Sequence, residues 1–350
     1  MISLVDLTVR HQLDASSVED AVLDVLRSGK WIGGHTVTEL ETRVAQRMGW
    51  PHAVGVGNGT DALELCLQVL GIGPGDEVIV PAVTFFATAG AVCRVGAEPV
   101  IVDIRSDRPL IDWTQLDAAR SSRTRAVIPV HLFGMDAGSV DTDLEIIDDL
   151  AQAVGAQPPP GSGRLAALSF YPTKVLSGAG DGGMVLCRER VMEERVRMLG
   201  SHGVRDGLHH RVEGSVGGNS RLDAIHAAVI GAQLEGLDRR LERRREIYRR
   251  TRTVLGDAVS VHQEGSPVSI LCVRHPRRDA LITHLRDHGV AAGIYYSRPL
   301  SKQPALASCR TLGTLPNAEA FCAEALALPC HAGITDQQLD HVLDCVRSFG

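Results

Sequence analysis

Short runs of continuous apolar residues alternate with helical patterns through the first half of this chain, and this alternation limits the fold more than any other feature. The apolar runs predict strands at residues 53–56, 77–80, 99–103, 126–130, 144–147, 166–170 and 184–187. Helical spacing between them predicts helices, among them 60–70 and 87–95. A strand that is apolar throughout needs cover on both faces, which parallel sheets obtain from their crossover helices. The sequence therefore predicts an α/β fold with a mostly parallel sheet flanked by helices.

The last third of the chain has a different pattern. A strongly basic helix is expected at 239–252, and it is followed by a strand at 268–273, a helix at 278–288 and a strand at 290–295. With 350 residues the chain is long enough for two domains. We predict a large domain over 1–238, and a linking helix with a small C-terminal α+β domain over 239–350. The charge run is typical of a solvated or domain-linking helix, with nucleic-acid binding as the alternative.

Charge, hydropathy and cysteine usage disfavour several classes of protein. The 36 basic and 42 acidic residues leave a net charge of −6, which argues against a nucleic-acid-binding surface. The most apolar stretch, Val78 to Cys93, is too short and interrupted for a membrane span, and the N-terminus lacks a secretory-signal pattern. Eight scattered cysteines form no CxxC pair, so we expect free thiols in a reducing cytoplasm and no metal site.

A glycine-rich segment follows the first predicted strand and runs Gly55-Val56-Gly57-Asn58-Gly59-Thr60-Asp61-Ala62. Its glycines let a ligand approach the backbone closely, and the start of the next helix offers free amides together with the Thr60 hydroxyl. This combination favours a phosphate site. The spacing G-x-G-x-G differs from the dinucleotide fingerprint and there is no Walker A lysine. A tight turn without a ligand is the alternative.

Two adjacent carboxylates, Asp148 and Asp149, follow the predicted strand at 144–147. Ligands of α/β sheets bind beyond the carboxyl ends of strands. A carboxylate at such a place can pair with a cationic ring nitrogen or with a metal. Capping of a helix by either residue is the alternative.

Lys174 lies just past the end of another predicted strand, and the only other lysines are Lys30 and Lys302. Burial of this amine would lower its pKa and make it nucleophilic, as a Schiff base requires. An exposed loop lysine is the alternative. Together, the phosphate cradle, the acid at a strand end and the lysine match the phosphate, ring nitrogen and aldehyde of pyridoxal 5′-phosphate.

The chain resembles the DegT/StrS-type sugar aminotransferases, a branch of the fold type I pyridoxal-phosphate enzymes, from about Val5 to Val342. The segments that carry the resemblance are Gly59-Thr60-Asp61-Ala62-Leu63, Gly73 to Pro81, Pro129 to Gly134, Ser169 to Lys174, Gly180-Asp181-Gly182-Gly183 and Asn219 to Asp223. The resemblance implies the fold type I aminotransferase architecture, pyridoxal 5′-phosphate as the cofactor, and a homodimer.

The resemblance also implies roles for individual residues. Gly59 and Thr60 would hold the phosphate through their backbone amides and the threonine hydroxyl, and Ser169 would add a second hydroxyl. Asp149 would pair with the ring nitrogen, and Gln152 would lie near the ring hydroxyl.

Three further residues receive roles from the resemblance. Lys174 would bind the cofactor aldehyde covalently. Phe85 would stack on the pyridine ring, with ordinary core packing as the alternative. Asn219 would reach across a dimer interface to the phosphate of the partner. The chain departs from the family on the substrate side, where it has Gly293-Ile294-Tyr295-Tyr296 in a segment that often carries a histidine.

We therefore expect an aminotransferase with Lys174 and Asp149 as its catalytic residues. It would move an amino group from glutamate or glutamine to a keto group of a nucleotide-linked sugar, in secondary-metabolite or cell-surface sugar biosynthesis. One alternative is a keto-cyclitol or other cyclic ketone as acceptor, and another is a non-catalytic binding or regulatory protein on the same scaffold. A deoxysugar dehydratase is disfavoured because that branch of the family has histidine in place of the lysine.

Overall fold

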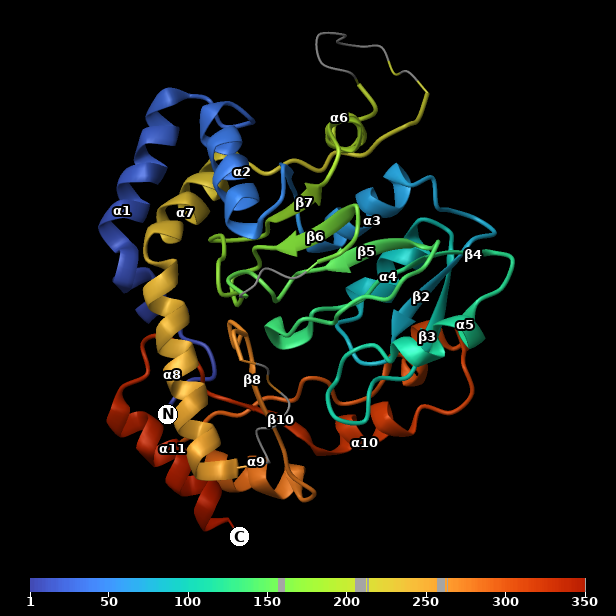
Figure 1. The fold of residues 1–350 in the computed structure, drawn as a ribbon. Coiled ribbons are helices and arrows are strands. Elements are labelled where there is room, and N and C mark those ends of the chain that lie inside the picture. Colours follow the sequence, from blue (N-terminus) through green and yellow to red (C-terminus); the bar gives the residue numbers. More distant parts are fainter. Residues whose placement is uncertain (157–160, 205–211, 213, 257–261, 263, 350) are drawn as a thin grey trace.

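A computed structural model describes residues 1–156, 161–204, 212, 214–256, 262 and 264–349. Within these residues, one eight-stranded sheet has the strand order β1-β7-β6-β5-β4-β2-β3-β9 (Figure 1). Its strands are β1 His52–Val56, β2 Glu77–Pro81, β3 Glu98–Val102, β4 Thr124–Val127, β5 Glu145–Asp149, β6 Leu165–Ser169, β7 Gly183–Cys187 and β9 Arg310–Thr311. Neighbouring strands are parallel along the part of this order that runs β6-β5-β4-β2-β3-β9. At the other end, β7 runs antiparallel to both β1 and β6. The predicted mostly parallel sheet is confirmed.

Helices cover both faces of this sheet (Figure 1). The helices are α1 Leu7–Ser28, α2 His35–Met48, α3 Gly59–Val69, α4 Ala87–Arg94, α5 Leu116–Ala119, α6 Arg190–Leu199, α7 Ala224–Glu235, α8 Leu237–Leu255, α9 Arg278–Asp287, α10 Pro316–Glu324 and α11 Asp336–Ser348. Alternate residues of β6 belong to two different apolar clusters. Leu165 and Ala167 join the cluster that contains α3, while Ala166 and Leu168 join the one that contains α2 and α7. The continuous apolar runs in the sequence thus reflect burial on both sides.

The C-terminal part adds a smaller α+β unit. In it β8 (Leu271–Arg274) pairs antiparallel with β10 (Ala325–Leu328), and residues of α8, α9 and α11 complete a third apolar cluster. The strand expected at 290–295 is wrong, because the backbone there makes only isolated bridges, from Val290 to Ile2 and from Gly293 to Ala327. The strand β10 takes the expected place beside β8. The domain boundary between 238 and 239 stays a prediction.

The basic helix α8 was predicted to be solvated or domain-linking, and it is solvated only in part, because two of its arginines are buried. Arg240 and Arg244 are only 3% exposed. Arg243 and Arg250 instead share the carboxylate of Asp336 on α11. The arginines of α8 therefore bind parts of the same chain to one another. Among the residues that the structure describes, no helix has the length and apolarity needed to cross a membrane.

Candidate active site

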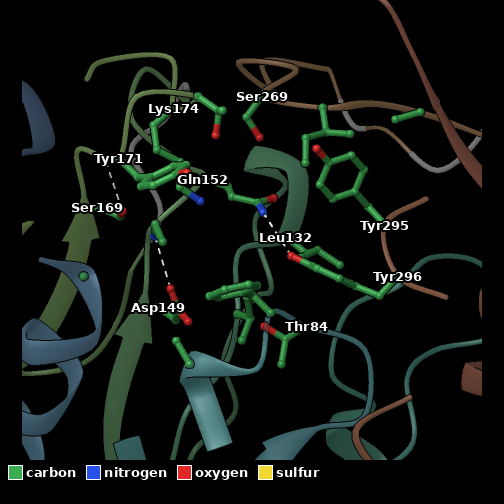
Figure 2. Close-up of a pocket in the computed structure, with 18 of the residues that line it drawn as sticks. Thr84, Leu132, Asp149, Gln152, Ser169, Tyr171, Lys174, Ser269, Tyr295 and Tyr296 are labelled. Atoms are coloured by element: carbon green, nitrogen blue, oxygen red, sulfur yellow. Dashed lines mark hydrogen bonds between the residues drawn. The ribbon is translucent and has the colours of Figure 1, made fainter. Parts of the chain in front are cut away.

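A cavity of about 710 Å³ opens where the carboxyl ends of β5 and β6 meet the start of α3 and the smaller C-terminal unit. This is the edge at which ligands bind in α/β sheets. Most of the residues predicted for the site line this cavity together: Gly59, Thr60, Phe85, Asp149, Gln152, Ser169 and Lys174. Figure 2 shows the labelled members of this set from different strands and loops pointing into one space.

The start of α3 forms one wall of the cavity. The Asn58 side chain caps this helix by accepting a hydrogen bond from the Asp61 N–H at 2.9 Å. The amides of Gly59 and Thr60 have no acceptor among the described residues, so they are free to bind an anion. Free amides at the start of an 11-residue helix carry a partial positive charge and suit a phosphate group.

Two glycines allow this helix start to approach the strand ends. A Cβ atom at Gly59 would lie 2.8 Å from Cβ and 3.2 Å from Oγ of Ser169. A Cβ atom at Gly183 would lie 2.3 Å from the carbonyl oxygen of Asn58. Since real Cβ atoms do not come so close to other atoms, only glycine at both positions permits the observed packing. The glycine motifs thus bring the helix amides and the Ser169 hydroxyl to the same cavity.

Asp149 ends β5 and is the buried acid of the cavity. Its Oδ2 accepts a hydrogen bond from the Thr88 hydroxyl at 2.9 Å, and its Oδ1 accepts one from the Ala151 N–H at 3.2 Å. The Thr84 hydroxyl lies 2.9 Å from that of Thr88. Burial raises the pKa of Asp149, although both hydrogen bonds and the positive charge of Lys174 oppose the rise. A cationic group placed in the cavity would offset this burial by pairing with the carboxylate.

Asp148 faces the opposite side of the sheet, because successive residues of a strand alternate. Its carboxylate accepts a hydrogen bond from the Gly163 N–H at 2.7 Å and lies 3.0 Å from Nε2 of His131. Burial alone would lower the pKa of His131, but Asp136 and Asp148 overcome burial and raise it to about 9. Of the two adjacent carboxylates, only Asp149 can therefore serve the cavity, and neither precedes a described helix.

Lys174 lies in the loop after β6, and its backbone N–H donates to the Tyr171 carbonyl at 2.8 Å. Burial lowers the pKa of its amine, and the negative charge of Asp149 opposes this effect. A lowered pKa increases the neutral, nucleophilic fraction of the amine near neutral pH. The interpretation of Lys174 as an exposed loop residue is therefore wrong, since the residue is half-buried and lines the cavity.

Gln152 is held in one orientation by its neighbours. Its Oε1 accepts a hydrogen bond from the Phe133 N–H at 2.7 Å, and its Nε2 donates to the Tyr296 hydroxyl at 3.4 Å. The amide therefore offers N–H donors, not its oxygen, to the cavity. Burial raises the pKa of Tyr296, which keeps this phenol neutral.

Phe85 is 60% exposed, and its ring centroid lies 6.5 Å from that of Tyr296. Tyr296 can be seen in Figure 2. Ordinary core packing is therefore not the role of Phe85. Asn219, in contrast, is exposed and does not line the cavity of its own chain, and its backbone bridges Ser201. Its predicted reach into a partner subunit stays a prediction.

Several residues that line the cavity or support it were not predicted from the sequence. Thr84 lines the cavity, whereas Thr88 does not line it and supports Asp149 through a hydrogen bond. Thr88 lies one helical turn after Thr84, and this spacing of two hydroxyls after a strand end was the available signal. Tyr296 belongs to a segment noted only for its difference from the family. Arg244 and Ser269 also line the cavity, and the basic helix gave no indication that one of its arginines is buried there.

The fold and the cavity define an α/β enzyme of the kind that holds pyridoxal phosphate, with helix amides for a phosphate, a buried acid and a lysine of lowered pKa around one space. A model of the DegT/DnrJ/EryC1/StrS aminotransferase family matches residues 13–347. The chain belongs to this family and is an aminotransferase.

Individual relatives cover almost the whole chain. The dTDP-3-amino-3,4,6-trideoxy-alpha-D-glucose transaminase of Streptomyces venezuelae is 37% identical over 99% of this chain and 96% of its own length. A protein of Geobacillus stearothermophilus named "Pleiotropic regulatory protein" is 36% identical over 99% of this chain and 98% of its own length. The fold matches Spr1654 of Streptococcus pneumoniae, solved in a PLP-form, with a TM-score of 0.86, 26% identity and 95% coverage of each chain. The cofactor of the family is pyridoxal phosphate, and the residues described above fit it.

Proposed function

We propose that this chain transfers an amino group from glutamate or glutamine to a keto group of a nucleotide-linked sugar. The proposal depends on one observation: Lys174, Asp149 and the free amides at the start of α3 all line the same cavity. The acceptor class comes from the relatives, since the transaminase of Streptomyces venezuelae is named for a dTDP-linked amino sugar.

In this proposal the amides of Gly59 and Thr60 and the hydroxyls of Thr60 and Ser169 hold the phosphate. Phe85 covers one face of the ring, which explains why an aromatic side chain is 60% exposed at this place. Gln152 donates from Nε2 toward the ring hydroxyl, because Phe133 fixes its oxygen elsewhere.

Asp149 keeps the ring nitrogen protonated by charge pairing, which its burial strengthens. The bound cofactor supplies an electron sink for the carbon that loses its proton. Nζ of Lys174 would take a proton from the α-carbon of the amino donor and deliver it to the aldehyde carbon of the cofactor, because its lowered pKa keeps part of the amine neutral.

We further propose a homodimer in which Asn219 of one protomer reaches the phosphate of the other. Asn219 is exposed and does not line the cavity of its own chain, and both observations support this arrangement. We place the reaction in the reducing cytoplasm, which agrees with eight cysteines that are all free thiols.

The test is a panel of acceptors and donors with the cofactor-loaded enzyme. Keto sugars linked to dTDP, UDP and GDP are each incubated with ¹⁵N-labelled glutamine, glutamate or alanine, beside a keto-cyclitol. We expect labelled amino sugar from one nucleotide-linked acceptor and none with Lys174→Ala. Product from the cyclitol alone would overturn the sugar assignment.

Because the relative from Geobacillus stearothermophilus has a regulatory name, the same panel also tests the alternative of a non-catalytic regulatory protein. A chain that binds pyridoxal phosphate but is never bleached by an amino donor would act without transamination. Bleaching of the visible absorption by glutamate or glutamine, even before an acceptor is found, contradicts that alternative.

A further inference from the structure

A single buried guanidinium belongs to the wall of the cavity. Arg244 is 3% exposed and lies on α8, and it lines the same cavity as Lys174 and Asp149. It also lines a second, very small cavity beside Arg240, so its side chain forms part of the wall between the two. The transamination roles proposed above leave Arg244 unused.

Arg240 and Arg244 are the buried arginines of α8, and of these two only Arg244 has no acidic partner among the described residues. Arg240 pairs with Asp14, and both Arg243 and Arg250 pair with Asp336. In the described part of the chain, Nη1 of Arg244 donates to the carbonyls of Val268 at 2.8 Å and Ser269 at 3.3 Å, and its guanidinium also interacts with the Cys330 thiol.

The guanidinium of Arg244 therefore has a thiol, and no carboxylate, as its side-chain partner among the described residues, and its Nε and Nη2 fork has no oxygen acceptor there. Burial lowers the pKa of this arginine, and the Cys330 thiol opposes that effect, whereas no carboxylate of the described residues does. A buried cation without a counter-ion is costly, and an anionic ligand in the cavity would remove that cost.

Ser269 gives an independent indication at the same place. It lines the cavity, and its hydroxyl oxygen is buried without any hydrogen-bond partner among the described residues. In the view of Figure 2, Ser269 lies toward the Lys174 end of the cavity, away from Asp149 and Thr84. Buried hydroxyls normally have a partner, and a ligand atom would supply one here.

The rest of this wall is apolar, with Ile270, Leu271, Ala327 and Leu328. Apolar surroundings strengthen the attraction between a guanidinium and an anion. The site offers one guanidinium fork and one hydroxyl, which match the two oxygens of a carboxylate. A diphosphate with two negative charges would need more donors than this wall provides.

We propose that Arg244 and Ser269 form the subsite that binds a carboxylate of the amino donor. The proposal rests on the proposed function, because it takes the donor to be an amino acid. It also explains how one cavity serves two substrates, since the donor is held by its charge on this wall and leaves as a keto acid before the acceptor enters.

The test uses the cofactor-loaded enzyme and glutarate, a dicarboxylate that has no amino group to react. Arg244→Gln removes the charge, Arg244→Lys keeps it, and Ser269→Ala removes the hydroxyl. Arg245→Gln is the matched control, because Arg245 also donates to a backbone carbonyl, that of Gly155, but does not line the cavity. Glutarate binding is measured by calorimetry, and bleaching of the visible absorption is followed with L-glutamate and with propylamine, which has no carboxylate.

We expect Arg244→Gln to weaken glutarate binding at least tenfold and Ser269→Ala about threefold, with Arg244→Lys between the parent and Arg244→Gln. The half-saturating glutamate concentration should rise in parallel, while the reaction with propylamine stays unchanged. Parental glutarate affinity in a cofactor-loaded Arg244→Gln protein would overturn the proposal. If Arg244→Gln fails to fold, parental glutarate affinity in both Ser269→Ala and Arg244→Lys would also overturn the proposal. An enzyme that no amine bleaches would instead refute the proposed function.

Discussion

Replacing Gly59 by alanine tests whether close packing of α3 against β6 positions the phosphate site. The new Cβ atom would lie 2.8 Å from Cβ and 3.2 Å from Oγ of Ser169, so either the helix start or the strand end must move. Overpacking of this kind costs about 1–3 kcal/mol. If that cost falls on the bound state, the dissociation constant of pyridoxal phosphate rises about 5- to 150-fold.

A double-mutant cycle separates this clash from any other effect of the alanine. Ser169→Gly removes the atoms that clash, after which the nearest remaining atom is the Ser169 Cα at 3.4 Å, an ordinary contact distance. The combined Gly59→Ala/Ser169→Gly protein should therefore bind the cofactor about as well as Ser169→Gly alone. Coupled residues give such non-additive energies.

The measurement is a titration of the cofactor-free protein with pyridoxal phosphate, followed by the visible absorption. Gly231→Ala is the control, because Gly231 lies within α7 and a Cβ there has only the Arg43 guanidinium at 4.0 Å. This control should bind the cofactor like the parent. If the two substitutions at 59 and 169 simply add, the steric argument for the glycine motif is refuted.

Three further predictions concern charges. The rate at which pyridoxal phosphate attaches to Lys174 should rise with pH through a midpoint below the ordinary lysine pKa, because burial lowers the pKa of this amine. The attached fraction is trapped with borohydride and measured by mass spectrometry. A midpoint at or above the ordinary lysine pKa contradicts this prediction. Asp149→Asn should slow bleaching by glutamate about 150- to 5000-fold, since removing one partner of a buried ion pair costs about 3–5 kcal/mol. Unchanged stopped-flow rates would exclude charge pairing. The pKa of His131 is raised to about 9, so its contribution to the free energy of unfolding is complete below about pH 6.5 and lost as the pH rises through 9; denaturant unfolding should show this loss in the parent and not in His131→Gln.

The strand and helix pattern predicted the large sheet because both of its faces are covered. Most strands of the sheet contain a continuous apolar run, and the glycine turn, Asp149 and Lys174 all lie at or just after a strand end, so strand prediction and site prediction supported each other. The same reasoning failed at 290–295, where an apolar run makes only isolated bridges. It also missed β10, which begins directly after α10 without a turn residue between them.

Contacts between distant segments account for what the sequence could not predict in the site. Alternation requires Asp148 and Asp149 to face opposite sides, but only the packing of α3 shows which side holds the cavity. The orientation of Gln152 depends on Phe133 and Tyr296, which lie far from it in different directions along the chain. Arg244 carries the same charge as its helical neighbours and is distinguished only by what surrounds it.

The edge strand β9 has a consequence for how the chain is made. Val100 of β3 pairs with Arg310, so one edge of the large sheet is completed by residues from the last part of the chain. During synthesis the N-terminal strands emerge long before their last neighbour, and β3 keeps unpaired backbone groups until then. Exposed edges of this kind promote aggregation of nascent chains. A polypeptide released before Arg310 would keep the unpaired edge of β3 permanently. Translation must therefore be nearly complete before this edge of the sheet is covered.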